Sequence, residues 1–108
     1  MIEIEESSGN VYADLGVADA GEMLLKAKLA AKIGEILAER GWSQTEASQV
    51  LGLSQPKLSY MLRGHFRGIS EAKMMDCLTR LGRNVKIVIG KESRKVQSGR
   101  IEVVSAQD

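Results

Sequence analysis

The fold is decided by residues 43–64, which read SQTEASQVLGLSQPKLSYMLRG. Ser43 and Glu46 form a capping-box pattern, in which each side chain accepts a hydrogen bond from a backbone N–H at the start of a helix. Gly52 is placed to end that helix after about two turns, because glycine enters the left-handed backbone region at low cost. Ser54 then caps a second helix, with a proline in its first turn where a missing N–H costs nothing. The stretch therefore predicts two short helices joined by a tight turn.

The two predicted helices are expected to cross with one face buried and the other face polar. Ala47, Val50 and Leu51 of the first helix are expected to face inward. The outward side chains of the second helix are Gln55, Pro56, Lys57, Ser59, Tyr60 and Arg63. This arrangement is the geometry of a helix-turn-helix. Such a second helix can lie in the major groove of double-stranded DNA, with its N-terminal residues against the base edges.

Apolar side chains recur at helical spacing on both sides of this unit. Before it, Asp19 with Glu22 reads as a capping box, and the period that follows predicts a helix that Gly41 ends. After it, Ser70 is expected to cap a helix that continues through Leu81. The helix before the unit is long enough for its N-terminal half to project beyond the core. The predicted fold class is all-α, with a bundle of four to five helices and a short β element at the C-terminal end.

The C-terminal β element is predicted from alternating apolar residues. Val85, Ile87 and Ile89 occupy alternate positions, which is typical of a strand, and a second apolar run spans residues 101–104. The two runs can pair as a hairpin, or the first can pair with its copy in a second chain. Because a lone two-stranded ribbon is marginal in water, support from a partner chain is favoured.

Composition and charge indicate one folded domain with oppositely charged parts. The 108 residues suit a single modest core, and the hydrophobic fraction of 44% is that of a globular chain. Residues 1–39 carry three basic and eight acidic side chains, a net charge of −5, whereas residues 40–68 and 69–108 each carry +3. This asymmetry indicates one polyanionic partner and one basic partner. The expected organisation is a loose acidic segment over 1–18, a helix-turn-helix domain over 19–82, and a β element with a tail over 83–108.

Several classes of function are not expected. No apolar run approaches the roughly 20 residues that span a bilayer, and the acidic start is unlike a signal peptide, so a cytoplasmic protein without membrane contact is expected. Cys77 is the only cysteine and is expected to be plain packing, which leaves neither a disulfide nor a multi-cysteine metal site. His65 has no second histidine to complete a site. No acid, base and nucleophile are assembled, so neither an enzyme nor a cofactor nor a metal is expected.

The order of these motifs resembles a known family of regulators. Residues 41–64 resemble the Xre/Cro family, which includes lambdoid phage repressors. A closer resemblance, over about residues 11–90, is to the HigA-like antitoxins of type II toxin–antitoxin operons. It rests on the segments VYADLGVADAGEMLLKAKLA, WSQTEASQVLGLSQPKLSYMLRGHFRGIS and LGRNVKIVI. The resemblance implies a lambda-repressor-like bundle, a homodimer on a palindromic operator, repression of the protein's own operon, and a complex with a RelE/HigB-like toxin.

The resemblance also implies roles for individual side chains. In the phage repressors, a Gln that opens the first helix of the unit binds a phosphate and supports a base-reading Gln at the start of the second, and Gln44 and Gln55 match those places. Tyr60 lies where the family has another reader. Pro56 departs from the usual polar residue, so the operator does not carry over. The expected DNA-binding residues are Gln44, Thr45, Ser54, Gln55, Pro56, Lys57, Ser59, Tyr60, Arg63, His65 and Arg67.

Alternatives stay open at this point. Arg63, His65 and Arg67 are either phosphate contacts or ordinary solvated loop charges. The unit as a whole is either a DNA reader or a protein-interaction module without DNA affinity. A DNA reader of this kind is either an antitoxin or a stand-alone phage or plasmid regulator without a toxin. Trp42 is expected to pack in or on the core rather than to stack on bases.

Overall fold

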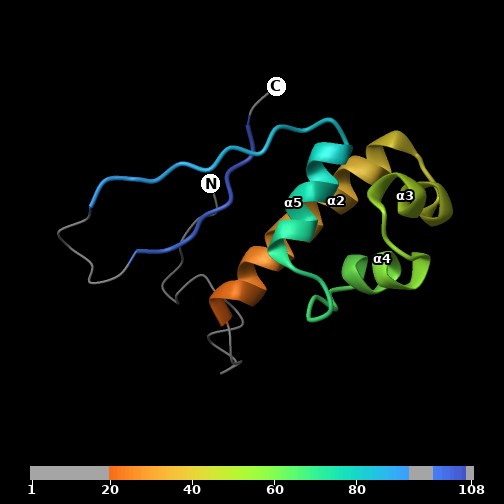
Figure 1. Ribbon diagram of the computed structural model, residues 1–108, viewed down its shortest axis with the longest axis horizontal. Coiled ribbons are helices and arrows are strands. Elements are labelled where there is room, and N and C mark those ends of the chain that lie inside the picture. The colour runs from red at the N-terminus through yellow and green to blue at the C-terminus, as the bar shows by residue number, and fades with distance from the viewer. Residues whose placement is uncertain (1–19, 93–98, 107–108) are drawn as a thin grey trace.

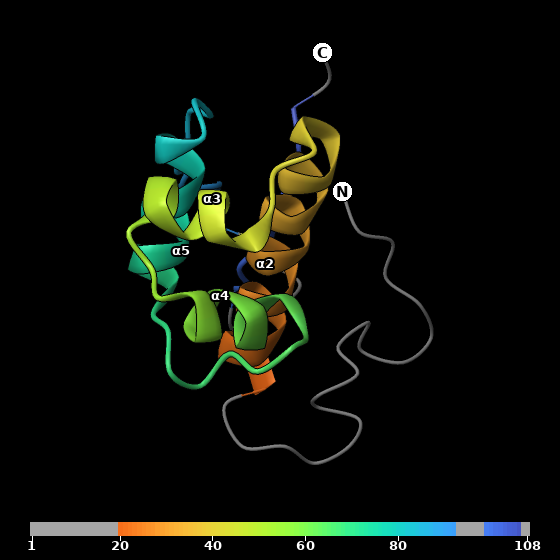
Figure 2. The same ribbon diagram turned by 90° about the vertical axis from the view of Figure 1, so that its right-hand side faces the viewer.

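The structure, a computed structural model, describes residues 20–92 and 99–106 (Figure 1). Its helices are α2 (Ala20–Arg40), α3 (Gln44–Leu51), α4 (Gln55–Leu62) and α5 (Glu71–Arg80). In the two views α5 runs alongside α2, and α3 and α4 form a pair of short helices against them (Figure 1, Figure 2). The predicted all-α fold is therefore confirmed. None of these helices is long and apolar enough to cross a membrane.

The long helix α2 packs against α5 and α4, while α3 packs against α4 and α5. Its 21 residues correspond to about 30 Å, and Gly41 follows it with φ 66° as predicted. The prediction that its N-terminal half projects beyond the core is wrong. Met23 and Lys26 are buried there, and Lys26 reaches the loop that follows α4. The predicted cap at Asp19 and the segment over 1–18 lie outside the described residues.

The predicted helix ends are confirmed in detail. Ser43 N–H donates to Glu46 Oε1 and Glu46 N–H donates to Ser43 Oγ, both at 3.1 Å, which completes the capping box. The hydroxyl oxygens of Ser54 and Ser70 accept from the backbone N–H three residues on, at 3.2 and 3.0 Å. Gly52 ends α3 with φ 67°. These local signals place the two short helices where the sequence predicted them.

All four helices contribute to one core. Its most deeply buried large side chains are Ile33, Leu51, Leu58, Met61, Met74, Cys77 and Leu81. The predicted packing role of Cys77 is confirmed, and burial raises the pKa of its thiol. Trp42 lies half-buried against the core, as expected. The inward prediction for Val50 is wrong, because this residue sits about 100° around the helix from Leu51 and remains 38% exposed.

The predicted C-terminal strand is absent from the described residues. Residues 83–92 leave the end of α5 as an extended segment, drawn in teal and blue in Figure 1. Ile87, Val88 and Ile89 are 76%, 84% and 89% exposed, and only Val103 of the second run packs against the core. A strand requires a hydrogen-bonded neighbour, and the described part of this chain does not supply one. The apolar residues do alternate along this segment, but the predicted hairpin between the two apolar runs is wrong for the single chain.

Candidate nucleic-acid interface

The first turn of α4 presents its side chains to solvent. Gln55, Pro56 and Lys57 are exposed, whereas Leu58 and Met61 on the opposite face are 0% and 1% exposed. The buried face fixes the rotation of α4 about its own axis, so the exposed face cannot turn inward. The first turn of α4 is therefore available to a partner as a rigid surface.

The turn that precedes α4 is clamped by two cations from α5. Lys73 Nζ donates to the Leu51 carbonyl oxygen at 2.8 Å, and Arg80 Nη1 donates to the Val50 carbonyl oxygen at 3.3 Å. Both cations reach carbonyl groups at the C-terminal end of α3, where the helix dipole favours positive charge. These contacts fasten α5 to the C-terminal end of α3, just before the turn that leads into α4.

Asp76 joins the two cations of this clamp. Its Oδ2 accepts from Lys73 Nζ at 3.1 Å and from Arg80 Nε at 2.9 Å. The hydrogen bond from Lys73, followed by that from Arg80, lowers the pKa of the Asp76 carboxyl. Sequence reasoning missed all three clamp residues. Their spacing at i, i+3 and i+7 places the three charged side chains on one face of the predicted helix, and this was the only signal of the clamp in the sequence.

The C-terminal end of α4 gathers a second set of side chains around Tyr60. The Arg63 guanidinium carbon lies 5.1 Å from the centre of the Tyr60 ring, and the His65 ring meets it edge-on with centroids 5.7 Å apart. The His65 N–H also donates to the Tyr60 carbonyl oxygen at 2.9 Å. Tyr60 itself is 55% exposed. An aromatic ring is thereby held at the surface in contact with the side chains of Arg63 and His65.

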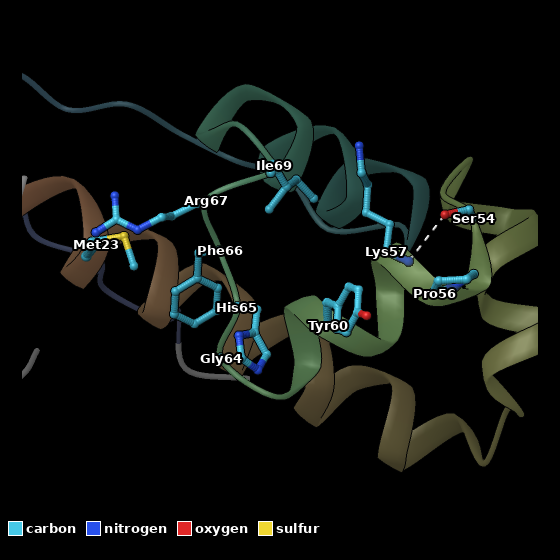
Figure 3. Close-up of a pocket in the computed structure, with 11 residues that line it drawn as sticks. Met23, Ser54, Pro56, Lys57, Tyr60, Gly64, His65, Phe66, Arg67 and Ile69 are labelled. Carbon is cyan, nitrogen blue, oxygen red and sulfur yellow. Dashed lines mark hydrogen bonds between the residues drawn. The ribbon is translucent and has the colours of Figure 1, made fainter.

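A groove of about 480 Å³ lies between α4, the following loop and the start of α2 (Figure 3). Its lining includes Met23, Ser54, Pro56, Lys57, Tyr60, His65, Phe66, Arg67 and Ile69. Met23, Phe66 and Ile69 are buried and form an apolar floor, while the basic side chains stand at the rim. The lining contains no acidic residue. An anion with an apolar part, such as a sugar–phosphate chain, matches this combination.

A second groove of about 550 Å³ adjoins the first along Ser54, Lys57 and Ile69. It is also lined by Ser70 and Lys73, so the N-terminal caps of both α4 and α5 open into it. Helix N-termini carry partial positive charge, which adds to that of the Lys57 ammonium group, while the Lys73 ammonium group is paired with Asp76. The second groove thus favours an anion as well.

The predicted site residues lie at the start of α3, along α4 and in the loop before α5. Ten of the eleven are exposed and Ser59 is half-buried. Ser54 already accepts a hydrogen bond as a helix cap. Whether these side chains contact DNA stays a prediction. The described residues hold no cluster of three or more His, Cys, Asp or Glu side chains suited to a metal ion.

Comparison with known proteins agrees with this geometry. A family model described as a helix-turn-helix domain matches residues 11–90. A solved structure described as a XRE-family transcriptional regulator is 35% identical, with a TM-score of 0.76, and the match covers 82% of this chain and 99% of that one. A search of curated proteins gives no match. The extent of the family match and the identity to the solved structure together show that this chain belongs to the XRE-type helix-turn-helix family.

Proposed function

We propose that this chain is a sequence-specific, DNA-binding transcriptional repressor that places α4 in a major groove. The observation that carries the proposal is the exposed first turn of α4, with Gln55, Pro56 and Lys57 on a helix whose other face is locked in the core. An α-helix with its side chains is about 10–12 Å in diameter, which suits a major groove about 12 Å wide. Membership of a regulator family supports the same function.

Gln55 is the residue we assign to base reading. It is the first residue of α4, and its terminal amide can pair with both N6 and N7 of an adenine. Pro56 offers only an apolar surface, which fits a thymine methyl group, and Tyr60 is held where a ring can pack on a sugar or a methyl group. Gln44, Thr45, Ser54 and Ser59 are assigned to short polar contacts, with Gln44 on a phosphate.

Phosphate contacts are assigned to four exposed side chains on α4 and in the loop that follows it, which are Lys57, Arg63, His65 and Arg67. The lining of both grooves contains no acidic side chain. Each cation that neutralises a phosphate releases counterions and steepens the salt dependence of binding. The same contacts fix the register of α4 in the groove without reading sequence. The chain therefore needs both sets of residues, one for affinity and one for specificity.

A homodimer on a palindromic operator is the assembly we propose. Two helix-turn-helix units read half-sites one helical turn apart, about 34 Å, which calls for a defined spacing between protomers. The extended residues 84–92 expose Ile87, Val88 and Ile89 and have backbone groups without a strand partner that a second copy can cover. We accordingly assign residues 19–82 to the DNA-binding domain and residues 83–108 to dimer formation.

The more specific proposal is that the chain is the antitoxin of a type II toxin–antitoxin pair, repressing its own operon and neutralising a RelE/HigB-like toxin. The resemblance over residues 11–90 supports it, and so does the net charge of −5 over residues 1–39, which suits a basic partner. In the described part of that segment, Glu22, Glu35 and Glu39 are exposed on α2. Complementary charge favours rapid association with a cationic ribonuclease.

A stand-alone regulator is the second candidate. The match to a chain described as a transcriptional regulator favours it, because that function requires no toxin. Both candidates bind DNA through the same surface, so they differ only in the protein partner. Co-purification of a small basic protein encoded beside this one supports the antitoxin, whereas purification of this chain alone from its native host supports the regulator.

Footprinting on the DNA upstream of the chain's own gene tests the proposed function. The purified protein is expected to protect a palindromic site, and the product of the neighbouring reading frame is expected to change that protection if it is a toxin. Uniform, weak protection along the whole fragment would contradict a sequence-specific repressor. A stable complex with another protein and no protection at all would instead support an interaction module.

A further inference from the structure

Lys26 is the only charged side chain buried among residues 20–92 and 99–106. It lies in the N-terminal half of α2 and is 6% exposed. Its Nζ donates to the Phe66 carbonyl oxygen at 3.3 Å and lies 3.8 Å from Glu71 Oε1. A buried ion pair is often no more stable than an apolar side chain of similar volume, because burial removes the charges from water. Stability alone therefore gives no reason for a lysine at this position.

The Phe66 carbonyl lies in the loop that carries two of the assigned phosphate contacts. It also accepts from the Ile69 N–H at 3.2 Å, which closes a turn containing Arg67. On the other side, His65 N–H donates to the Tyr60 carbonyl oxygen at 2.9 Å and ties the loop to α4. The Phe66 ring is itself buried in the core. Arg67 is thus an exposed cation on a short backbone segment with an anchor at each end.

We propose that Lys26 is a positioning residue for DNA binding, whose buried ammonium holds the Phe66 carbonyl so that Arg67 meets the DNA backbone in a fixed geometry. This role rests on the proposed function. It means that α2 contributes to DNA binding through one residue that positions the loop. Lys26 is buried, so it acts through the loop and not by contact with a phosphate. Without this anchor the loop samples more conformations, and ordering it on DNA then costs entropy that the anchored loop has already lost.

The first test compares Lys26→Met with Lys28→Met in the full chain without DNA. Both variants remove one positive charge from α2, and the side chain of Lys28 has no hydrogen bond or ion pair with another described residue. Amide hydrogen exchange at Ile69 is expected to be about tenfold faster in Lys26→Met and within about twofold of the original in Lys28→Met. Equal exchange at Ile69 in the two variants would overturn the proposal, whether or not the chain binds DNA.

The second test is a double-mutant cycle on operator affinity with Arg67→Ala. This substitution is expected to weaken binding about fivefold when Lys26 is present, and less than about twofold in the Lys26→Met chain. The slope of log K against log salt should fall by about one unit in Lys26→Met or Arg67→Ala, and no further when the two are combined. Additive losses would overturn the positioning role. Absence of operator binding by the original chain would instead count against the proposed function, and the exchange measurement would still decide the role of Lys26.

Two more variants separate positioning from a loss of fold. Lys26→Arg keeps a cation with hydrogen-bond donors. It is therefore expected to keep the exchange at Ile69 slow, and Arg67→Ala is expected to weaken operator binding in this variant as much as in the original chain. If Lys26→Met does not fold, as judged by circular dichroism, Lys26→Gln takes its place in both tests. The amide of Gln is one bond too short to reach the carbonyl, so original exchange rates in Lys26→Gln would overturn the proposal.

Discussion

Gly52 holds the turn between α3 and α4 through two properties of one residue. Its φ of 67° lies in the left-handed region, which costs a side chain about 1–2 kcal/mol. A Cβ at this position would also lie 2.9 Å from Arg80 Nη1, the group that donates to the Val50 carbonyl oxygen. Any larger residue must therefore both accept a strained backbone and displace part of the clamp.

Gly52→Ala is expected to lower the free energy of unfolding by more than Gly41→Ala. Gly41 has nearly the same φ, 66°, but open space around its would-be Cβ, so its substitution costs only the backbone strain, about 1 kcal/mol. At Gly52 the lost hydrogen bond of Arg80 adds about 1 kcal/mol. Urea denaturation of both variants gives the difference. Equal losses would mean that the Arg80 contact contributes nothing to stability.

The element that holds the C-terminal end of α3 is α5. Lys73, Asp76 and Arg80 lie within two turns of this helix and fasten it to the C-terminal end of α3. Asp76 accepts hydrogen bonds from both cations, which lowers the pKa of its carboxyl from 3.8. Because the folded-state pKa is below the unfolded value, the carboxylate stabilises the fold above the unfolded pKa. That contribution is lost as the pH falls through the folded pKa.

Asp76→Asn is accordingly expected to lower the melting temperature at neutral pH and to have little effect in strong acid. At neutral pH the variant lacks the charge that orients both cations, whereas below the lowered pKa the original chain is neutral at this position too. Melting curves of the two proteins should therefore converge as the pH falls below about 4. A difference in melting temperature that is constant across this range would show that the charge of Asp76 does not act as described.

The helices of this chain could be predicted because their ends are encoded locally. Ser43, Ser54 and Ser70 each accept from a backbone N–H three residues on, a pattern visible in the sequence alone. The clamp could not be predicted in the same way, because Lys73 and Arg80 reach carbonyl groups 22 and 30 residues earlier in the chain. Contacts between distant segments depend on how the helices pack, which the spacing of residues within one helix does not specify.

In the candidate site, too, the features encoded locally could be predicted and those that depend on packing of distant segments could not. The outward position of Gln55 and Lys57 follows from helical periodicity and was predicted correctly. The groove beside them was not predicted, because its floor includes Met23, far earlier in the chain. The prediction of a C-terminal strand was wrong for a different reason. Periodicity at Val85 to Ile89 reports that one face is apolar, but it does not say which backbone pairs with it.

For the whole molecule, the exposed C-terminal segment sets the expected assembly. Ile89→Lys is expected to weaken association of the proposed dimer at least about tenfold, because it places a charge on the surface that a second copy covers. The melting temperature extrapolated to low concentration should change little, since Ile89 is 89% exposed in the single chain. Sedimentation equilibrium measures the association. Lys86→Ser, in the same segment, is the control, and an equal effect of both variants would argue against an apolar dimer surface.

The salt dependence of DNA binding is also a property of the whole molecule, because it depends on the number of positive charges that meet phosphates. Arg63 is exposed beside Tyr60 and is assigned to a phosphate, so Arg63→Ala is expected to weaken binding to all DNA sequences alike. The slope of log K against log salt should decrease by about one unit, since one fewer counterion is released. Fluorescence anisotropy with operator and random duplexes over a range of salt provides the measurement. An unchanged slope would mean that Arg63 is an ordinary solvated charge.

The most direct test of the central claim is the affinity of Gln55→Ala for operator and for random DNA, measured side by side at one salt concentration. If α4 reads base edges through Gln55, the operator complex should lose about 1–3 kcal/mol, the preference at one base pair should relax, and the random complex should be nearly unchanged. Equal losses on both duplexes would contradict base reading by the first turn of α4.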